Sequence, residues 1–138
     1  MLDATAQERL IEAAREARKR AYAPYSKFAV GAAVLCADGS VFEGCNIENS
    51  AFGPTVCAER VAMFSAVAAG HRDIRAIAVV GRPDLLLTPC GVCRQVMAEL
   101  APEAEVVMEG GGKRLVMTVR ELLPQPFGLR EAPRGTSD

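Results

Sequence analysis

Large aromatic side chains are scarce in this chain of 138 residues, which has no tryptophan and is only 5% aromatic. A core without them must be built mainly from Ala, Val, Leu, Ile and Met. Half of the residues are apolar, which is enough for one domain of ordinary size. We therefore expect a single domain over residues 1–127, with a small-residue interior in which the elements approach each other closely.

An excess of one charge is also missing, because 16 basic residues oppose 17 acidic ones and the formal net charge is −1. Such a balance gives no global field to attract a polyanion or an anionic membrane. The densest basic run, Arg15 to Arg20, contains Glu16 and follows Glu12. At helical spacing Glu12 reaches Arg15 and Glu16 reaches Arg20, which is typical of a solvated helix face. We expect a small, nearly neutral ligand, and neither nucleic acid nor membrane as a partner.

Long apolar runs are absent as well. No stretch approaches the roughly 20 residues that cross a bilayer, and the N-terminus lacks the apolar segment of a signal peptide. We therefore expect the protein in the cytoplasm. Its five cysteines are an odd number, which in such a chain favours free thiols and metal chemistry over disulfides.

Apolar periodicity and turn residues predict the element order α, β, β, α, β, α, β, β, α. The expected elements are a helix at 5–23, strands at 28–36 and 40–47 around Asp38-Gly39, a helix opened by Pro54 and Thr55 and closed by Gly70, a strand at 74–81, a helix at 91–100, strands at 104–109 and 114–117, and a short helix at 118–124. The central β-α-β-α-β run requires parallel neighbours joined by right-handed crossovers. The sequence therefore predicts an α/β fold, a three-layer α/β/α sandwich on a five-stranded mixed sheet.

Two further structural expectations follow from local patterns. In the second helix Val61, Phe64 and Val67 repeat at a spacing of three, so we expect them to face the core. The tail at residues 128–138 is polar and carries proline and glycine, so we expect it to be flexible.

Three cysteines carry the main functional signal. Cys90 and Cys93 form "PCGVC" at the start of the third helix, which alone is typical of either a redox dithiol or half of a metal site. Cys57 also stands at the start of a helix that follows a strand. Helices that flank adjacent parallel strands begin at the same edge of the sheet, so the three thiols can converge there. Three thiolates without a fourth protein ligand are typical of a catalytic zinc, which keeps one position open for water.

Glu59 follows Cys57 by two residues, which on a continuous helix would place the two side chains about 200° apart. In a first turn, however, both side chains can point past the helix end toward one site. A carboxylate in a dry pocket has a raised pKa, so Glu59 can accept a proton from water there and return it. The alternative is a glutamate that only stabilises the helix N-terminus.

Three thiolates around Zn²⁺ leave a net charge of −1, which weakens the pull of the metal on a water proton. Arg60 directly follows Glu59 in the sequence, and Arg94 directly follows Cys93. We expect both guanidinium groups to donate hydrogen bonds to thiolate sulfurs and so withdraw charge. The alternative is that both are surface arginines.

A ligand followed by x-Glu and later by Pro-Cys-x-x-Cys is the signature of zinc-dependent deaminases, here with cysteine as the first ligand. More specifically, the chain resembles the small cytidine deaminases of pyrimidine salvage. The segments that carry the resemblance occur in family order between Tyr22 and Phe127: "AYAPYSKFAVGAAV", "GCNIENSAF", "TVCAER", "PCGVCRQ" and "ELLPQPF".

The resemblance implies hydrolytic deamination of cytidine and 2′-deoxycytidine, with one Zn²⁺ per subunit held by Cys57, Cys90 and Cys93. It further implies that Asn46 and Glu48 bind the ribose hydroxyl groups. Phe28 and Ala58 are implied to contact the nucleoside, and Phe127 to enter the site of a neighbouring subunit in a homotetramer. Without the resemblance, Asn46 and Glu48 are typical of a polar loop and Phe127 of a buried hydrophobic residue.

Two positions depart from the family pattern. Phe52 stands where a tyrosine is common, and the loop from Gly81 to Thr88 is unusually apolar. Neither departure involves the three cysteines or Glu59.

The alternative functions are a deaminase of another aminopyrimidine nucleoside, such as a nucleoside antibiotic, or, in a different class, a thiol redox protein that uses Cys90 and Cys93 or a structural zinc module.

The remaining cysteines and the single histidine receive structural interpretations. The hairpin at Asp38-Gly39 places Cys36 and Cys45 out of register, so we expect two small buried side chains and no disulfide. His71 lies in a capping turn after the second helix. The glycines at 110–112 lack the lysine and helix of a phosphate loop and predict a turn.

Overall fold

The computed structural model of the chain describes residues 1–129. Residues 130–138, which make up most of the tail predicted to be flexible, lie outside the described residues. The predicted order of elements is confirmed. The elements are α1 (Ala4–Arg18), β1 (Gly31–Cys36), β2 (Val41–Cys45), α2 (Ala58–Ala68), β3 (Ile74–Val80), α3 (Gly91–Leu100), β4 (Glu105–Gly110), β5 (Lys113–Thr118) and α4 (Val119–Leu122).

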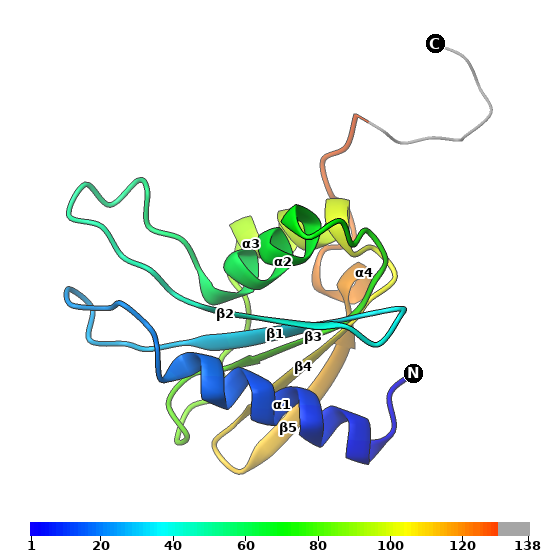
Figure 1. Ribbon diagram of the computed structural model, residues 1–138, viewed down its shortest axis with the longest axis horizontal. Coiled ribbons are helices and arrows are strands. Elements are labelled where there is room, and N and C mark those ends of the chain that lie inside the picture. The colour runs from blue at the N-terminus through cyan, green and yellow to red at the C-terminus, as the bar shows by residue number, and fades with distance from the viewer. Residues whose placement is uncertain (130–138) are drawn as a thin grey trace.

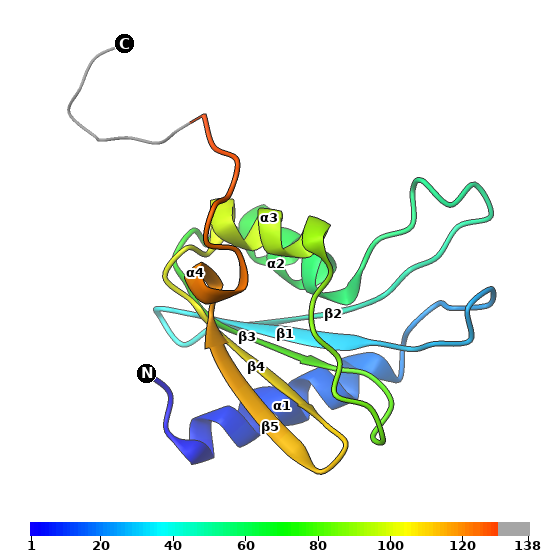
Figure 2. The ribbon, with the colours of Figure 1, turned by 180° about the vertical axis from the view of Figure 1, so that it is seen from behind.

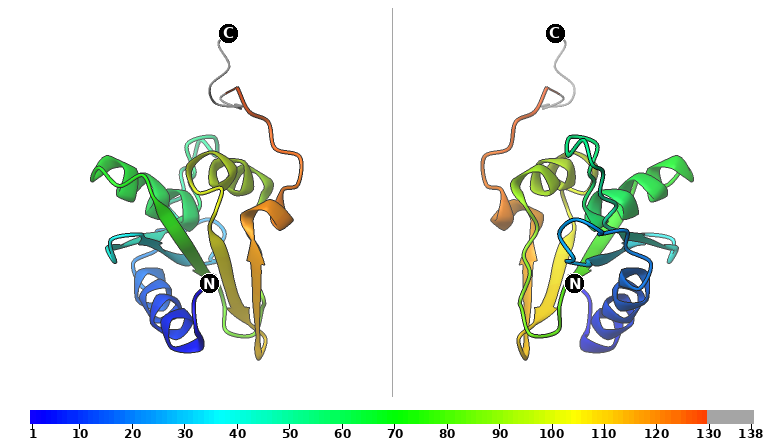
Figure 3. Two further views of the ribbon diagram at one scale, coloured as in Figure 1. Left: turned by 90° about the vertical axis from the view of Figure 1, so that its right-hand side faces the viewer. Right: turned by 90° about the vertical axis from the view of Figure 1, so that its left-hand side faces the viewer.

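The five strands form one mixed sheet in the order β2-β1-β3-β4-β5, in which only β3 and β4 pair in parallel. Helix α1 covers one face of this sheet, and α2, α3 and α4 lie on the other (Figures 1 and 2). Views along the sheet show the same layers from the side (Figure 3). The predicted three-layer sandwich is therefore confirmed. No helix of residues 1–129 is long and apolar enough to span a membrane.

The strands that precede α2 and α3 are not neighbours, which corrects the expected topology. β1 lies between β2 and β3 and is antiparallel to both. Since β2 and β3 are each antiparallel to β1, they run in the same direction as each other. Helices α2 and α3 therefore begin at the same edge of the sheet, even though a third strand separates the strands that lead into them.

Small residues bring the helices directly onto the sheet, as the composition predicts. A Cβ atom on Gly31 in β1 would lie 1.9 Å from the carbonyl oxygen of Ala14 in α1. On the other face, a Cβ atom on Gly44 in β2 would lie 2.5 Å from the carbonyl oxygen of Ala58 in α2. Only glycine permits such contacts between backbones.

Helix α1 ends five residues before its predicted end, because the backbone N–H groups of residues 19–21 donate to carbonyl groups only three residues back. The ion pairs change accordingly. Glu12 pairs with Arg15 as predicted, but Glu16 pairs with Lys19. Arg20, beyond the helix, pairs with Glu43 on β2 instead.

The predicted core face of α2 is wrong. The helix begins at Ala58 rather than near Pro54, and the side chain of Phe64 is 46% exposed. The buried residues of α2 are Ala58, Glu59, Ala62, Met63 and Ala66. The close approach at Gly44 explains the difference, because a face that touches the backbone of a strand accommodates alanine and not phenylalanine.

The remaining structural expectations are largely confirmed. All five cysteines of the described residues are free, with Cys36 buried and Cys45 only half-buried. The hairpin register pairs Leu35 with Val41 and Gly31 with Cys45, so Cys36 and Cys45 are out of register as expected. The backbone N–H of His71 donates to the carbonyl of Ala66, so this histidine closes α2 in the predicted turn.

Candidate metal and catalytic site

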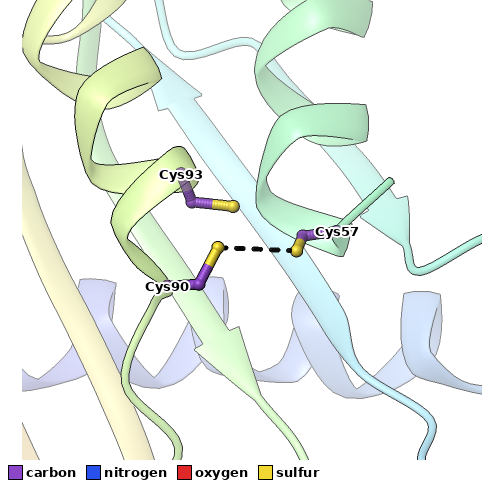
Figure 4. Close-up of side chains that lie close together, drawn as sticks. All are labelled: Cys57, Cys90 and Cys93. Atoms are coloured by element: carbon purple, nitrogen blue, oxygen red, sulfur yellow. Dashed lines mark hydrogen bonds between the residues drawn. The ribbon is translucent and has the colours of Figure 1, made fainter. Parts of the chain in front are cut away.

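Three cysteine sulfurs meet where α2 and α3 begin (Figure 4). Cys57 is the N-cap of α2, Cys90 is the N-cap of α3, and Cys93 lies in the first turn of α3. The three Sγ atoms lie within 4.8 Å of one another, and those of Cys57 and Cys90 are 3.8 Å apart. The predicted convergence of these side chains is confirmed.

The two N-cap cysteines occupy positions that favour negative charge. Both have extended backbone conformations, and within the described chain neither sulfur caps its own helix by a hydrogen bond. The first N–H groups of each helix and the helix dipoles therefore place partial positive charge beside the sulfurs. This environment stabilises thiolates, the form of cysteine that binds metals.

The thiols of the cluster also share hydrogen bonds. The pKa of Cys57 is lowered to about 5, first because Cys93 donates to its sulfur and then because Arg60 and Cys90 also do. The pKa of Cys93 is raised by the same hydrogen bond, with burial adding to the effect. Cys57 therefore ionises before Cys93, and metal binding would displace the proton that Cys93 holds.

The donor set fits a zinc ion. Three soft thiolates select zinc over the hard cations that prefer oxygen ligands. Two sulfurs at a Zn–S distance of about 2.3 Å in tetrahedral geometry are separated by about 3.8 Å. The Sγ atoms of Cys57 and Cys90 already have this separation. The described residues place no further cysteine, histidine or carboxylate in this cluster, which suits a site with one open position.

Glu59 is the one buried charged residue of the described chain, with 3% of its surface exposed. Burial raises the pKa of its carboxyl group to about 7, and the negative charge of Cys57 acts in the same direction. Its charge in turn contributes to the raised pKa of Cys93, so the carboxylate lies close to the cysteine cluster. A carboxyl group of this kind can both accept and donate a proton near neutral pH.

The two arginines of the predicted site behave differently. The Nη2 of Arg60 donates to the Sγ of Cys57 over 3.3 Å, and its buried Nε has no partner among the described residues. Arg94 instead donates from Nε to the carbonyl of Pro89 and from Nη1 to the carbonyl of Leu122. The structure thus brings Arg60 to a sulfur as expected, whereas Arg94 joins the start of α3 to the end of α4.

The predicted ribose ligands lie in the loops that lead into the site. The carboxamide of Asn46 accepts from the N–H of Val30 and donates to the carbonyl of Phe28, both at 2.8 Å. The carboxylate of Glu48 accepts from the N–H groups of Tyr25 and Ser26 and from the Ser26 hydroxyl. Both side chains therefore hold the loop that carries Phe28.

The remaining predicted contact residues lie on separate elements. The half-buried ring of Phe28 lies beside Gly81 at the end of β3, and Ala58 is fully buried at the first position of α2. Phe127 is not buried, because 70% of its surface is exposed. Its backbone is held by Gln95, a residue that the sequence reasoning missed although it stands in "PCGVCRQ", two positions after Cys93.

Comparisons with known proteins agree with this geometry. Residues 4–109 match the family model of the cytidine and deoxycytidylate deaminase zinc-binding region. A cytidine deaminase from Halalkalibacterium halodurans is 53% identical over 120 residues, which cover 86% of this chain and 91% of that protein. A blasticidin-S deaminase from Bacillus cereus is 34% identical over 126 residues, which cover 86% of this chain and 89% of that protein.

A solved structure extends the likeness to the fold. The crystal structure of cytidine deaminase from Burkholderia pseudomallei superimposes with a TM-score of 0.84 at 53% identity, covering 87% of this chain and 98% of that one. The chain therefore belongs to the cytidine and deoxycytidylate deaminase family of zinc-binding proteins.

Proposed function

We propose that this protein catalyses the hydrolytic deamination of cytidine and 2′-deoxycytidine, which yields uridine or 2′-deoxyuridine and ammonia and serves pyrimidine salvage. The observation that carries the proposal is the buried carboxyl group of Glu59 beside three convergent cysteine sulfurs. A cytidine deaminase that is 53% identical over most of both chains supports the choice of substrate.

Cys57, Cys90 and Cys93 are the proposed ligands of one Zn²⁺ per chain. When bound, the ion supplies Lewis-acid chemistry, because it lowers the pKa of a coordinated water toward neutrality. Arg60 acts on this ligand set through its hydrogen bond to Cys57, which withdraws negative charge from the sulfur.

Glu59 is the proposed proton carrier of the reaction. Its carboxylate takes a proton from the water that adds to C4 of the base and delivers this proton to N3. It then transfers the second proton of that water to the amino group, which leaves C4 as ammonia while the C4 oxygen becomes the carbonyl of the product. Burial keeps the pKa of Glu59 near 7, which suits both directions of transfer.

Asn46 and Glu48 are the proposed ligands of the ribose hydroxyl groups, with Phe28 and Ala58 against the nucleoside. The contacts of Asn46 use one N–H and one lone pair of its carboxamide, which leaves one of each for a hydroxyl group. A carboxylate has about four acceptor positions, and Glu48 uses three of them on the 25–26 backbone and hydroxyl. Both side chains can therefore hold the loop and a sugar together.

Phe127 is proposed to complete the site of a neighbouring copy in a homotetramer. The exposed ring is compatible with this role, because 70% of the surface of Phe127 is open to contact with a neighbouring copy. We also place the protein in the cytoplasm, where reducing conditions keep thiols such as these five free.

A zinc determination combined with an absorbance assay on cytidine tests the proposal. We expect close to one Zn²⁺ per chain and loss of the cytidine absorbance band as uridine forms. Zinc-loaded protein that leaves both cytidine and 2′-deoxycytidine unchanged would overturn the assigned substrate. A preparation without zinc, in which Cys90 and Cys93 interconvert between dithiol and disulfide, would instead support a thiol redox protein.

A second candidate substrate is an aminopyrimidine nucleoside antibiotic. The similarity to the blasticidin-S deaminase from Bacillus cereus favours including it. The same assay over a panel of cytidine, 2′-deoxycytidine and blasticidin S separates the two candidates by their kcat/KM values. We expect the natural nucleosides to be preferred.

Mixing inactive variants tests the shared site. Glu59→Gln removes the proton carrier of every chain, and Phe127→Ala removes the contributed ring. If the ring serves a neighbour, oligomers reassembled from both variants regain activity, because some sites then combine an intact Glu59 with a ring from the other variant. Absence of any recovery in mixed oligomers would place each ring at its own site.

A further inference from the structure

The backbone of Phe127 is held by a single side chain of α3. Gln95 donates from Nε2 to the carbonyl of Phe127 over 2.8 Å, and its Oε1 accepts from the N–H of the same residue at 3.1 Å. One planar carboxamide therefore satisfies both polar backbone groups of one residue, in the way that a neighbouring strand does in a β-ladder. This pair of hydrogen bonds fixes the position and the orientation of the backbone at Phe127.

Neighbouring features make the attachment specific. Pro124 and Pro126 precede the attachment point; each fixes its own φ angle and has no N–H of its own. Arg94, the residue before Gln95, holds the carbonyl of Leu122 at the end of α4. Two adjacent residues of α3 thus hold both ends of the segment 122–127.

The attachment leaves the aromatic ring free. Both hydrogen bonds of Gln95 use backbone atoms of Phe127, and 70% of the surface of Phe127 remains exposed. The same helix carries Cys90 at its N-cap and Cys93 in its first turn. The position of the exposed ring is therefore set relative to the helix that bears two of the proposed metal ligands.

We propose that Gln95 is a positioning residue, which holds Phe127 so that its ring is presented to the nucleoside site of a second copy of the chain. The inference rests on the proposed function, because it assumes that the ring completes a nucleoside site. It goes further in assigning the placement of that ring to one carboxamide of the metal-binding helix.

A tryptophan probe tests the placement directly. The chain has no tryptophan, so Phe127→Trp introduces a single fluorophore at the end of the attached segment. In that background, Gln95→Met keeps a side chain of similar size and removes both hydrogen bonds. We expect lower fluorescence anisotropy and stronger quenching by iodide, because the segment is released.

Gln125→Ala is the matched control, since it removes a glutamine from the same segment where that side chain is exposed. It should leave both signals unchanged. Equal anisotropy and quenching in the Gln95→Met and Gln125→Ala proteins would overturn the proposal. If circular dichroism shows that Gln95→Met folds poorly, Gln95→Glu replaces it, because glutamate keeps the acceptor and loses only the donated hydrogen bond. We expect anisotropy and quenching between those of the unchanged protein and those of a released segment. Values equal to those of the Gln125→Ala control would overturn the proposal in this variant too.

Kinetics on the unlabelled protein separates positioning from general stability. Gln95→Met should raise KM for cytidine about tenfold, as expected for the loss of two hydrogen bonds, with kcat changed less than about twofold. A fall in kcat at constant KM would contradict the positioning role. If the wild-type protein does not deaminate cytidine at all, the proposed function fails, while the fluorescence comparison still decides whether Gln95 holds the segment.

Discussion

The Nη2 of Arg60 donates a hydrogen bond to the Sγ of Cys57 over 3.3 Å, between residues one helical turn apart at the start of α2. The thiolate of Cys57 is thereby stabilised, which contributes to its lowered pKa of about 5. The same contact moves negative charge from the sulfur toward the guanidinium. Three thiolates around a divalent ion need such a contact, because their excess charge opposes the loss of a proton from water.

Replacing Arg60 should therefore reduce turnover more than zinc content. We expect Arg60→Gln to lower kcat for cytidine by about 10- to 100-fold while zinc stays close to one per chain at saturating metal. Steady-state kinetics and metal analysis on the same preparation check this. Arg75→Gln is the control, because Arg75 is exposed and its ion pair within residues 1–129 is with the exposed Asp73. Wild-type turnover in Arg60→Gln would mean that the contact with Cys57 has no part in catalysis.

Replacing Glu59, the proposed proton carrier, should separate loss of chemistry from loss of folding. Glu59→Gln keeps the size of the buried side chain and removes its ability to accept a proton. We expect zinc content and the melting temperature to stay near wild type while kcat falls by at least about 10³-fold. Glu103→Gln is the control, since this carboxylate lies in an exposed ion pair with Arg120. A nearly active Glu59→Gln protein would show that another group carries the proton.

The proposed metal ligands can be distinguished from the other cysteines by their effect on zinc content. Cys57→Ala, Cys90→Ala and Cys93→Ala should each reduce bound zinc to well below one per chain, because a site with two remaining sulfurs is incomplete. Cys45→Ala should retain full zinc, as this half-buried thiol lies outside the cluster. Full zinc in any of the three cluster variants would remove that residue from the ligand set.

Local patterns predicted the element order and the meeting of the three cysteines because both depend on short-range signals. Asp38-Gly39 marks the hairpin, and the prolines and glycines mark the ends of the remaining elements. Both proposed metal-binding helices begin at the sheet edge reached by strands of one direction, even though β1 separates those strands. The prediction succeeded here because strand direction matters for the site and adjacency does not.

Long-range contacts were not predictable in the same way. The core face of α2 depends on the approach of Ala58 to Gly44, which the helical spacing of Val61, Phe64 and Val67 does not reveal. Gln95 and Phe127 are joined by side-chain contacts to a backbone 32 residues away. Polar contacts of this kind leave no periodic pattern in a single sequence.

The approach of α2 to β2 should make Gly44 intolerant of any side chain. A Cβ atom there would lie 2.5 Å from both the carbonyl oxygen of Ala58 and the backbone nitrogen of Ala62, and neither backbone atom can rotate away. We expect Gly44→Ala to destabilise the fold by about 3 kcal/mol, which corresponds to a melting temperature about 10 °C lower in a chain of this size. Gly53→Ala is the matched control, because no atom of the described residues lies within 4 Å of a Cβ at that position. Since Cys57 and Glu59 belong to the turn that is displaced, zinc affinity should fall with stability in Gly44→Ala. Equal melting temperatures for the two glycine variants would contradict the close packing that positions the site.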